Sequence, residues 1–166
     1  MEQTALTGSR IGARFASGYA RTLLHVVSIP AVIAMAVIVF LLALWRGSRR
    51  RALWAAGTIA ATNASAQLLK HTLLWRPDFG LSQRWDAANT LPSGHTAVAA
   101  STAVALVLVV GARWRSLTAW VGALLAAAMG YSTLVCQWHR PGDVMAALLL
   151  AVGWGAVAVA CGAWAN

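Results

Sequence analysis

Acidic side chains are the scarcest feature of this sequence, with four Asp and Glu against 13 Lys and Arg in 166 residues. Charged residues of both signs make up only 10% of the chain, whereas a soluble domain carries roughly 25%. This shortage of charge, together with a hydrophobic content of 60%, indicates that most of the surface does not face water. The composition therefore argues against an ordinary soluble domain and favours an integral membrane protein.

Cysteine and glycine-rich loops are also in short supply. Cys136 and Cys161 lie in separate apolar runs without CxxC spacing, so we expect buried free thiols. No Walker-type loop is present, which argues against a nucleotide-driven machine. The net charge of +9 comes from arginines between apolar runs. This pattern fits anionic lipid headgroups better than nucleic acid, which we do not expect as a partner.

Long apolar runs dominate what is present. A membrane-spanning helix needs about 20 mostly apolar residues, and five stretches qualify: 23–45, 52–75, 94–112, 117–138 and 144–164. Tryptophans lie near the ends of these runs, where their rings settle at the headgroup level. Isolated spans must satisfy their own backbone hydrogen bonds, so we predict an all-α, polytopic transmembrane bundle of about five spans.

The first 22 residues have a different character. Ile11, Phe15 and Tyr19 recur every four residues beside arginines, which fits a helix lying in the membrane interface. A mobile basic tail fits equally well. The apolar run after this segment is too long for a cleavable signal peptide. We therefore predict a basic N-terminal segment, 1–22, followed by a single transmembrane domain, 23–166.

The arginines between the spans predict the topology. The connections 46–51 and 113–115 are arginine-rich and fall on one side, which should be cytoplasmic. The loop 76–92 and the turn 139–142 then fall on the extracytoplasmic side. With five spans the N-terminus also lies outside, although it carries arginines.

Polar residues gather near the end of the second run. Asn63, Gln67, Lys70 and His71 fall on one helical face, and polar groups in a membrane usually face a bundle interior or a polar cavity. Helix–helix hydrogen bonding is the alternative for Asn63 and Gln67, and snorkelling to the interface for Lys70. Lys70 is the only lysine, and Arg76 follows it closely enough to reach the same outer mouth.

The segment Pro92-Ser93-Gly94-His95 opens the third run. Pro and Ser before an apolar run indicate a helix start. Such a start offers backbone amides and a positive dipole end to an anion. His95 adds a group that gives or takes a proton, although a plain helix cap with an incidental histidine has the same pattern.

A second polar helix start opens the fifth run. Pro141 suits a first helical position, and His139 and Asp143 are four residues apart. The carboxylate can therefore hold one imidazole nitrogen and leave the other as a nucleophile. Taken alone, such a pair is as often structural as catalytic.

Together these elements bring two imidazoles, one carboxylate, several cations and a helix N-terminus to one membrane face. Phosphoryl transfer needs positive groups around the phosphoryl oxygens, an in-line nucleophile and an acid for the leaving oxygen. The set supplies each of these parts.

These residues resemble the type-2 phosphatidic acid phosphatases, or lipid phosphate phosphatases, whose active-site fold is shared with vanadium haloperoxidases. That family carries Lys-x6-Arg-Pro, Pro-Ser-Gly-His and Ser-Arg-x5-His-x3-Asp. The second motif is intact, and the third keeps its spacing from Ser132 to His139 and Asp143. The resemblance covers about residues 60–150 and implies a lipid phosphatase/haloperoxidase-like core.

The resemblance also implies roles for individual residues. His139 would attack phosphorus and form a phosphohistidine, Asp143 would orient it, and His95 would protonate the leaving oxygen. The phosphoryl oxygens would be held by Lys70, Arg76, Ser93 and the Gly94 amide. Members of the family work without a metal or another cofactor.

The chain departs from the family pattern in three ways. Five residues rather than six separate Lys70 from Arg76, and Thr133 replaces the arginine of the third motif. Arg140 is our candidate for the missing phosphate-binding cation. The family usually has six spans, and the one ahead of the core is not evident here, which raises the possibility of a homodimer.

The sequence thus predicts a metal-independent phosphatase at the extracytoplasmic face of the cell membrane. The substrate would be a polyprenyl phosphate or diphosphate, phosphatidate or phosphatidylglycerol phosphate. Three alternatives stay open: phosphoryl transfer to a lipid or sugar acceptor, a non-catalytic lipid-phosphate-binding relative, and a metal enzyme. The last would use ligands from among His71, Asp78, His95 and His139, which lack familiar ligand spacing.

Overall fold

A computed structural model describes residues 29–45, 48–74, 89–136 and 138–165 of the chain. Every regular element in these ranges is a helix, as the sequence predicted. The α-helices are α3 (Ile29–Trp45), α4 (Arg49–Leu68), α5 (Gly94–Val109), α6 (Ala112–Val135) and α7 (Pro141–Ala160), and a π-helical turn, η1 (Leu69–Leu73), continues α4.

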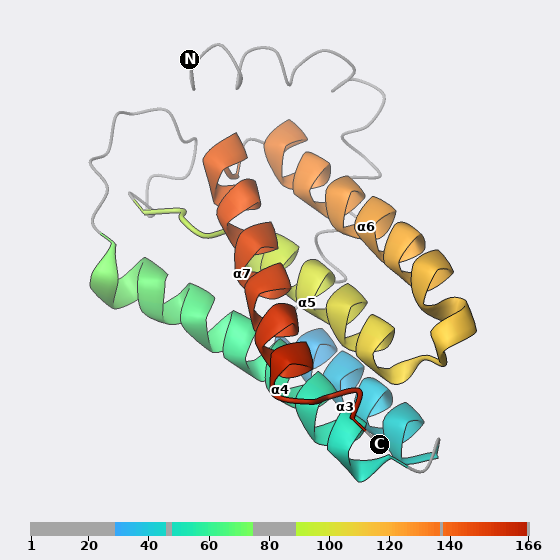
Figure 1. Ribbon diagram of the computed structural model, residues 1–166. Coiled ribbons are helices and arrows are strands. Elements are labelled where there is room, and N and C mark those ends of the chain that lie inside the picture. Colours follow the sequence, from blue (N-terminus) through green and yellow to red (C-terminus); the bar gives the residue numbers. More distant parts are fainter. Residues whose placement is uncertain (1–28, 46–47, 75–88, 137, 166) are drawn as a thin grey trace.

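The helices form an antiparallel bundle around α5, which packs against α3, α4, α6 and α7 (Figure 1). Two ends of the bundle follow from this arrangement. One, the arginine end, carries the starts of α4 and α6 and the finishes of α3, α5 and α7. At the other, the histidine end, α5 and α7 begin and η1 and α6 finish.

Two helices begin earlier than the apolar runs suggested. Ser48 caps α4, because its Oγ accepts the amide proton of Arg51 at 3.2 Å, and α6 begins directly after Gly111. The arginines expected in loops at 49–51, 113 and 115 therefore lie in the first turns of helices. They remain together at one end of the bundle, as the topology argument required.

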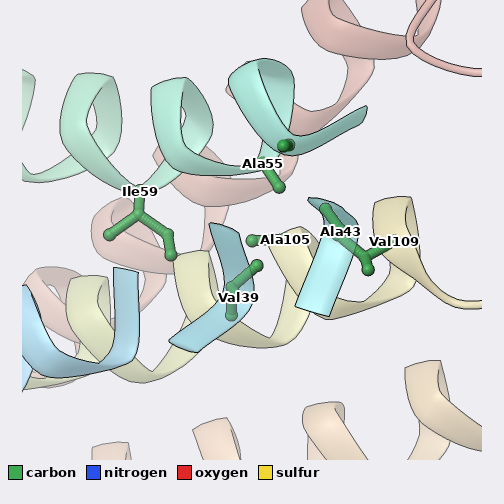
Figure 2. Close-up of a cluster of buried hydrophobic side chains, with 7 residues drawn as sticks. Val39, Ala43, Ala55, Ile59, Ala105 and Val109 are labelled. Atoms are coloured by element: carbon green, nitrogen blue, oxygen red, sulfur yellow. The ribbon is translucent and has the colours of Figure 1, made fainter. Parts of the chain in front are cut away.

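Alanines let the helices pack closely around two larger buried side chains, Val39 and Ile59. Val39 and Ala43 of α3, Ala55 and Ile59 of α4, and Ala105 of α5 meet in one buried cluster (Figure 2). With little side-chain volume between them, helix backbones approach and gain van der Waals contact, which is the usual basis of helix association in membranes.

Polar bonds between helices add to this packing. Asn63 of α4 donates to Ser101 Oγ of α5 at 3.2 Å, so the helix–helix interpretation of Asn63 is confirmed. Trp154 Nε1 of α7 donates to Ser65 Oγ of α4 at 3.1 Å. Gln67 instead lies beside His71 on its own helix, with 3.2 Å between Oε1 and Nε2.

The surface of the bundle supports a membrane location. Helices α6 and α7 are long and apolar enough to cross a bilayer, whereas α5 is apolar but shorter. Large apolar side chains are exposed along α6, among them Leu117, Trp120 and Leu124. The number of spans stays a prediction. The expectation of two buried thiols was wrong: Cys136 is half-buried, and Cys161 is exposed because α7 ends at Ala160 and the cysteine lies in the following turn.

Candidate active site

Asp143 is a buried carboxylate at the histidine end. Pro141 occupies the first position of α7, as its sequence context predicted, and Asp143 follows in the same turn with no exposed surface. Its Oδ2 accepts the backbone N–H of Arg140 at 2.9 Å and the hydroxyl of Thr90 at 2.6 Å. A buried carboxylate requires such donors, and these two hold it in one orientation.

His139 lies against the same carboxylate oxygen. Its Nδ1 is 3.4 Å from Asp143 Oδ2, and the imidazole is almost fully buried. This separation is longer than a good hydrogen bond, as is common for catalytic pairs before substrate binds. Because Nδ1 faces the carboxylate, Nε2 lies on the far side of the ring, away from Asp143.

The N-terminus of α5 meets the N-terminus of α7 directly. The backbone N–H of Ser93 donates to the carbonyl oxygen of Asp143 at 3.0 Å. Ser93 is fully buried, and its Oγ accepts the hydroxyl proton of Thr96 at 3.0 Å. A Cβ added at Gly94 would meet no atom of the described residues within 4 Å. Within the described part of the chain, the first turn of α5 is therefore open beside Gly94, and backbone amides there lack intrahelical partners.

His95 extends the cluster toward His139. Its ring is half-buried and packs against Trp138, with 5.8 Å between ring centroids and an interplanar angle of 52°. Trp138 directly precedes His139 in the chain. The structure thus brings both predicted catalytic histidines to neighbouring segments at one end of the bundle.

Lys70 is tied to the site through its backbone. It lies in η1, and its carbonyl oxygen accepts Asn89 Nδ2 at 2.9 Å. Asn89 also donates to Leu74 O at 2.6 Å, and its Oδ1 accepts the amide of Leu91 at 3.1 Å. One side chain therefore joins the lysine-bearing turn to the segment that opens α5. Arg76 lies outside the described residues, so its place in the site stays a prediction.

The position of the missing arginine is closed to a phosphate. Thr133 has no exposed surface, and its hydroxyl donates to Gly130 O at 2.7 Å within α6. Arg140 is also buried, at 4% exposure, and lies between His139 and the start of α7. Of these two residues, only Arg140 brings a cation to the histidine end.

Sequence reasoning missed Thr90 and Asn89. Thr90 is buried and bonds to Asp143 across 53 positions of sequence, and Asn89 joins two segments through three hydrogen bonds. The only signal was their place as adjacent polar residues immediately before Leu91-Pro92. Neither residue belongs to a motif, so the sequence did not predict the bond of Thr90 to Asp143 or the link that Asn89 makes between η1 and the segment before α5.

The arrangement is suited to a tetrahedral oxyanion. The starts of α5 and α7 converge, and each contributes the positive end of a helix dipole. An imidazole backed by a carboxylate stands beside them, with a second imidazole nearby. Among the described residues, no three His, Cys, Asp or Glu side chains are grouped closely enough to hold a metal ion.

Comparison with known protein families agrees with this geometry. The family model described as the PAP2 superfamily matches residues 51–166, which is most of the chain and includes every candidate site residue. Neither the curated proteins nor the solved structures contain a match.

Proposed function

The chain belongs to the PAP2 superfamily, whose members generally hydrolyse phosphate esters, and we propose that it dephosphorylates a membrane lipid through a phosphohistidine. The observation that carries this proposal is the junction of the two motif-bearing helix starts, Ser93 N–H to Asp143 C=O at 3.0 Å. This bond supports a phosphoryl group lying between the α5 amides and the His139 imidazole.

In the first step, His139 Nε2 attacks phosphorus, and the bond from phosphorus to the leaving oxygen breaks. His95 gives its proton to that oxygen, so the dephosphorylated lipid leaves as an alcohol, or as a monophosphate if the substrate is a diphosphate. Asp143 holds the imidazole through Nδ1 and stabilises the positive charge that develops on it.

In the second step, water attacks the phosphohistidine and the P–N bond breaks. His95, now neutral, takes a proton from that water, and inorganic phosphate leaves with both histidines restored. In both steps the phosphoryl charge would be neutralised by the cations Lys70, Arg76 and Arg140. The Ser93 hydroxyl and the Gly94 amide would donate hydrogen bonds to the phosphoryl oxygens. No step requires a metal ion or another cofactor.

The surroundings of the site favour a lipid over a soluble ester. The site lies at one end of a bundle whose outer faces carry exposed large apolar side chains, so a phosphate headgroup can reach it while an apolar tail stays in the bilayer. The five arginines at the other end, Arg49, Arg50, Arg51, Arg113 and Arg115, support a cytoplasmic position for that end. The active site would then face out of the cytoplasm.

Phosphate release from purified protein tests this function. We expect release from at least one of phosphatidate, phosphatidylglycerol phosphate and polyprenyl mono- or diphosphates, and loss of at least a thousandfold in His139→Ala. Addition of a lipid or sugar acceptor separates hydrolysis from transfer to that acceptor. Release from none of these substrates by folded wild-type protein would refute the proposal and favour a non-catalytic, lipid-binding relative.

A further inference from the structure

A groove outside the active site runs between α6 and α7, with α5 as its floor. Its volume is about 750 Å³, within the usual range for small-molecule sites. The 17 described residues that line it are all Ala, Gly, Val, Leu or Trp, including Ala119 and Ala123 on α6 and Val152 and Ala156 on α7. Such a lining offers an apolar chain contact along its length and offers no partner to a polar group.

The groove narrows toward the active site. At the histidine end α6 and α7 meet at Gly130 and Val144, and a Cβ at Gly130 would lie 2.6 Å from Val144 Cγ1. Val144 adjoins Asp143, so this contact stands between the catalytic cluster and the groove. One turn closer to the arginine end, Ala126 and Leu148 line the groove, and from there α6 and α7 diverge toward that end (Figure 1).

At the arginine end the groove ends at a tryptophan whose ring is contacted by an arginine. Trp164 lines the groove, and its Nε1 donates to Leu108 O at 3.3 Å. The Arg115 guanidinium lies 4.0 Å from the centre of the Trp164 ring. The Nε of Arg115 is buried and has no hydrogen-bond partner within the described part of the chain.

Charge at this end is all of one sign among the described residues. Arg50 donates to Cys161 O at 3.3 Å, on the turn that carries Trp164, and Arg49, Arg51 and Arg113 lie at the same end. Asp143, the only acidic residue in the described ranges, is at the opposite end. A ligand for this site must therefore pair an anionic head with an apolar chain.

We propose that the groove binds an anionic phospholipid of the leaflet opposite the active site. One acyl chain lies between α6 and α7 over α5, and the phosphodiester accepts hydrogen bonds from the terminal Nη groups of Arg115, because its Nε is buried. Charge complementarity selects this occupant over an apolar helix of a second copy, which would leave Arg115 without an acceptor. The contact between Gly130 and Val144 disfavours the substrate's own tail.

The test measures lipid binding to the full chain in detergent, by native mass spectrometry and by thermal shift. The probe is dioleoyl phosphatidylglycerol, with dioleoyl phosphatidylcholine as its neutral counterpart. Both are phosphodiesters, which a monoester phosphatase leaves intact, and variants at Arg115 and Ala156 distinguish binding in the groove from binding of a product at the active site. We expect one phosphatidylglycerol to bind per chain and to raise the melting temperature more than phosphatidylcholine does.

Three variants locate the bound lipid. Arg115→Gln should weaken phosphatidylglycerol binding about fivefold, the value for roughly one kcal/mol per arginine at an anionic surface. Ala156→Phe, which fills the open groove wall, should abolish the one-to-one complex. Arg113→Gln makes the same charge change on an exposed arginine that lies over Trp114, which does not line the groove, whereas Arg115 lies over Trp164, which does. Arg113→Gln should therefore bind as wild type does.

Several results would overturn the inference. If Arg113→Gln and Arg115→Gln weaken phosphatidylglycerol binding equally, the lipid is attracted by the general positive charge of this end rather than by Arg115. If phosphatidylglycerol and phosphatidylcholine bind equally, the protein does not distinguish their headgroups. A dimer that Ala156→Phe dissociates would assign the groove to a second copy. A rise in KM for long-chain but not short-chain lipid phosphates in Ala156→Phe would assign it to the substrate tail.

Discussion

Replacing Thr90 with valine removes one hydroxyl and little else. The side chains have nearly the same shape, and Thr90 is buried at 6% exposure. Its Oγ1 donates to Asp143 Oδ2 at 2.6 Å, beside the 2.9 Å bond from the Arg140 amide. Thr90→Val therefore takes a short hydrogen-bond donor from a buried carboxylate without changing the packing around it.

The cost follows from the chemistry of that bond. A hydrogen bond to a charged group contributes about 1.5–3 kcal/mol, because the buried acceptor cannot recover its lost partner from water. For a domain of this size each kcal/mol shifts the melting temperature by about 2–4 °C. We therefore expect Thr90→Val to melt about 3–12 °C below wild type, monitored through the fluorescence of the nine tryptophans.

Thr62 supplies a matched control on α4. It is also fully buried, but its hydroxyl has no hydrogen-bond partner among the described residues. Thr62→Val makes the same chemical change and removes an unsatisfied polar group, so it should leave the melting temperature unchanged or raise it. The difference between the two variants isolates the contribution of the bond to Asp143.

Activity provides an independent readout of positioning. In Thr90→Val, kcat should fall by up to about a hundredfold, because a small misplacement of the nucleophile has effects of that size. KM should change little, since the phosphate-binding groups stay in place. Thr90→Ser retains the hydroxyl and should recover most of both properties. If Thr90→Val melts and turns over like Thr62→Val, the bond to Asp143 neither stabilises the fold nor positions the site.

Three further predictions concern packing, charge and metal. Gly130→Ala should lower the melting temperature relative to wild type, since overpacking against Val144 costs about 1–3 kcal/mol. Gly153→Ala meets no atom of the described residues within 4 Å, so it should raise the melting temperature by improving helix propensity. Equal thermal shifts in the two variants would contradict the close approach of Gly130 to Val144. Arg140→Gln should reduce kcat/KM about a hundredfold, while Arg51→Gln at the other end should not, and near-normal turnover in Arg140→Gln would remove it from the phosphate site. Phosphate release should be unchanged after dialysis against EDTA, and loss that added metal restores would revive the metal-enzyme alternative.

The helices were predictable because each is a long apolar run, but their first residues were not. The runs suggested that the second and fourth helices begin at about residues 52 and 117, whereas the structure starts them at Arg49 and Ala112. Hydropathy penalises arginine, while a cap such as Ser48 permits a helix to begin with charged residues at the membrane surface.

The site was predictable where its parts are close in sequence. His139 and Asp143 are four residues apart across the predicted start of a helix, so their spacing alone indicated that the two side chains could meet, as they do at 3.4 Å. The bonds made by Asn89 and Thr90 depend on how the segment before α5 lies against η1 and α7, which no local pattern encodes. Burial of Thr133 was equally hidden, because the motif says which residue is absent and not whether a cation would fit there.

The 3.0 Å bond between Ser93 N–H and Asp143 C=O has a consequence for the evolution of this site. Both partners are main-chain groups, so this bond between the starts of α5 and α7 does not depend on which side chains stand at positions 93 and 143. Only proline at position 93 would delete the donor. Substrate preference can thus drift through side-chain replacement, in nature or in directed evolution, while the scaffold keeps its two helix starts in register.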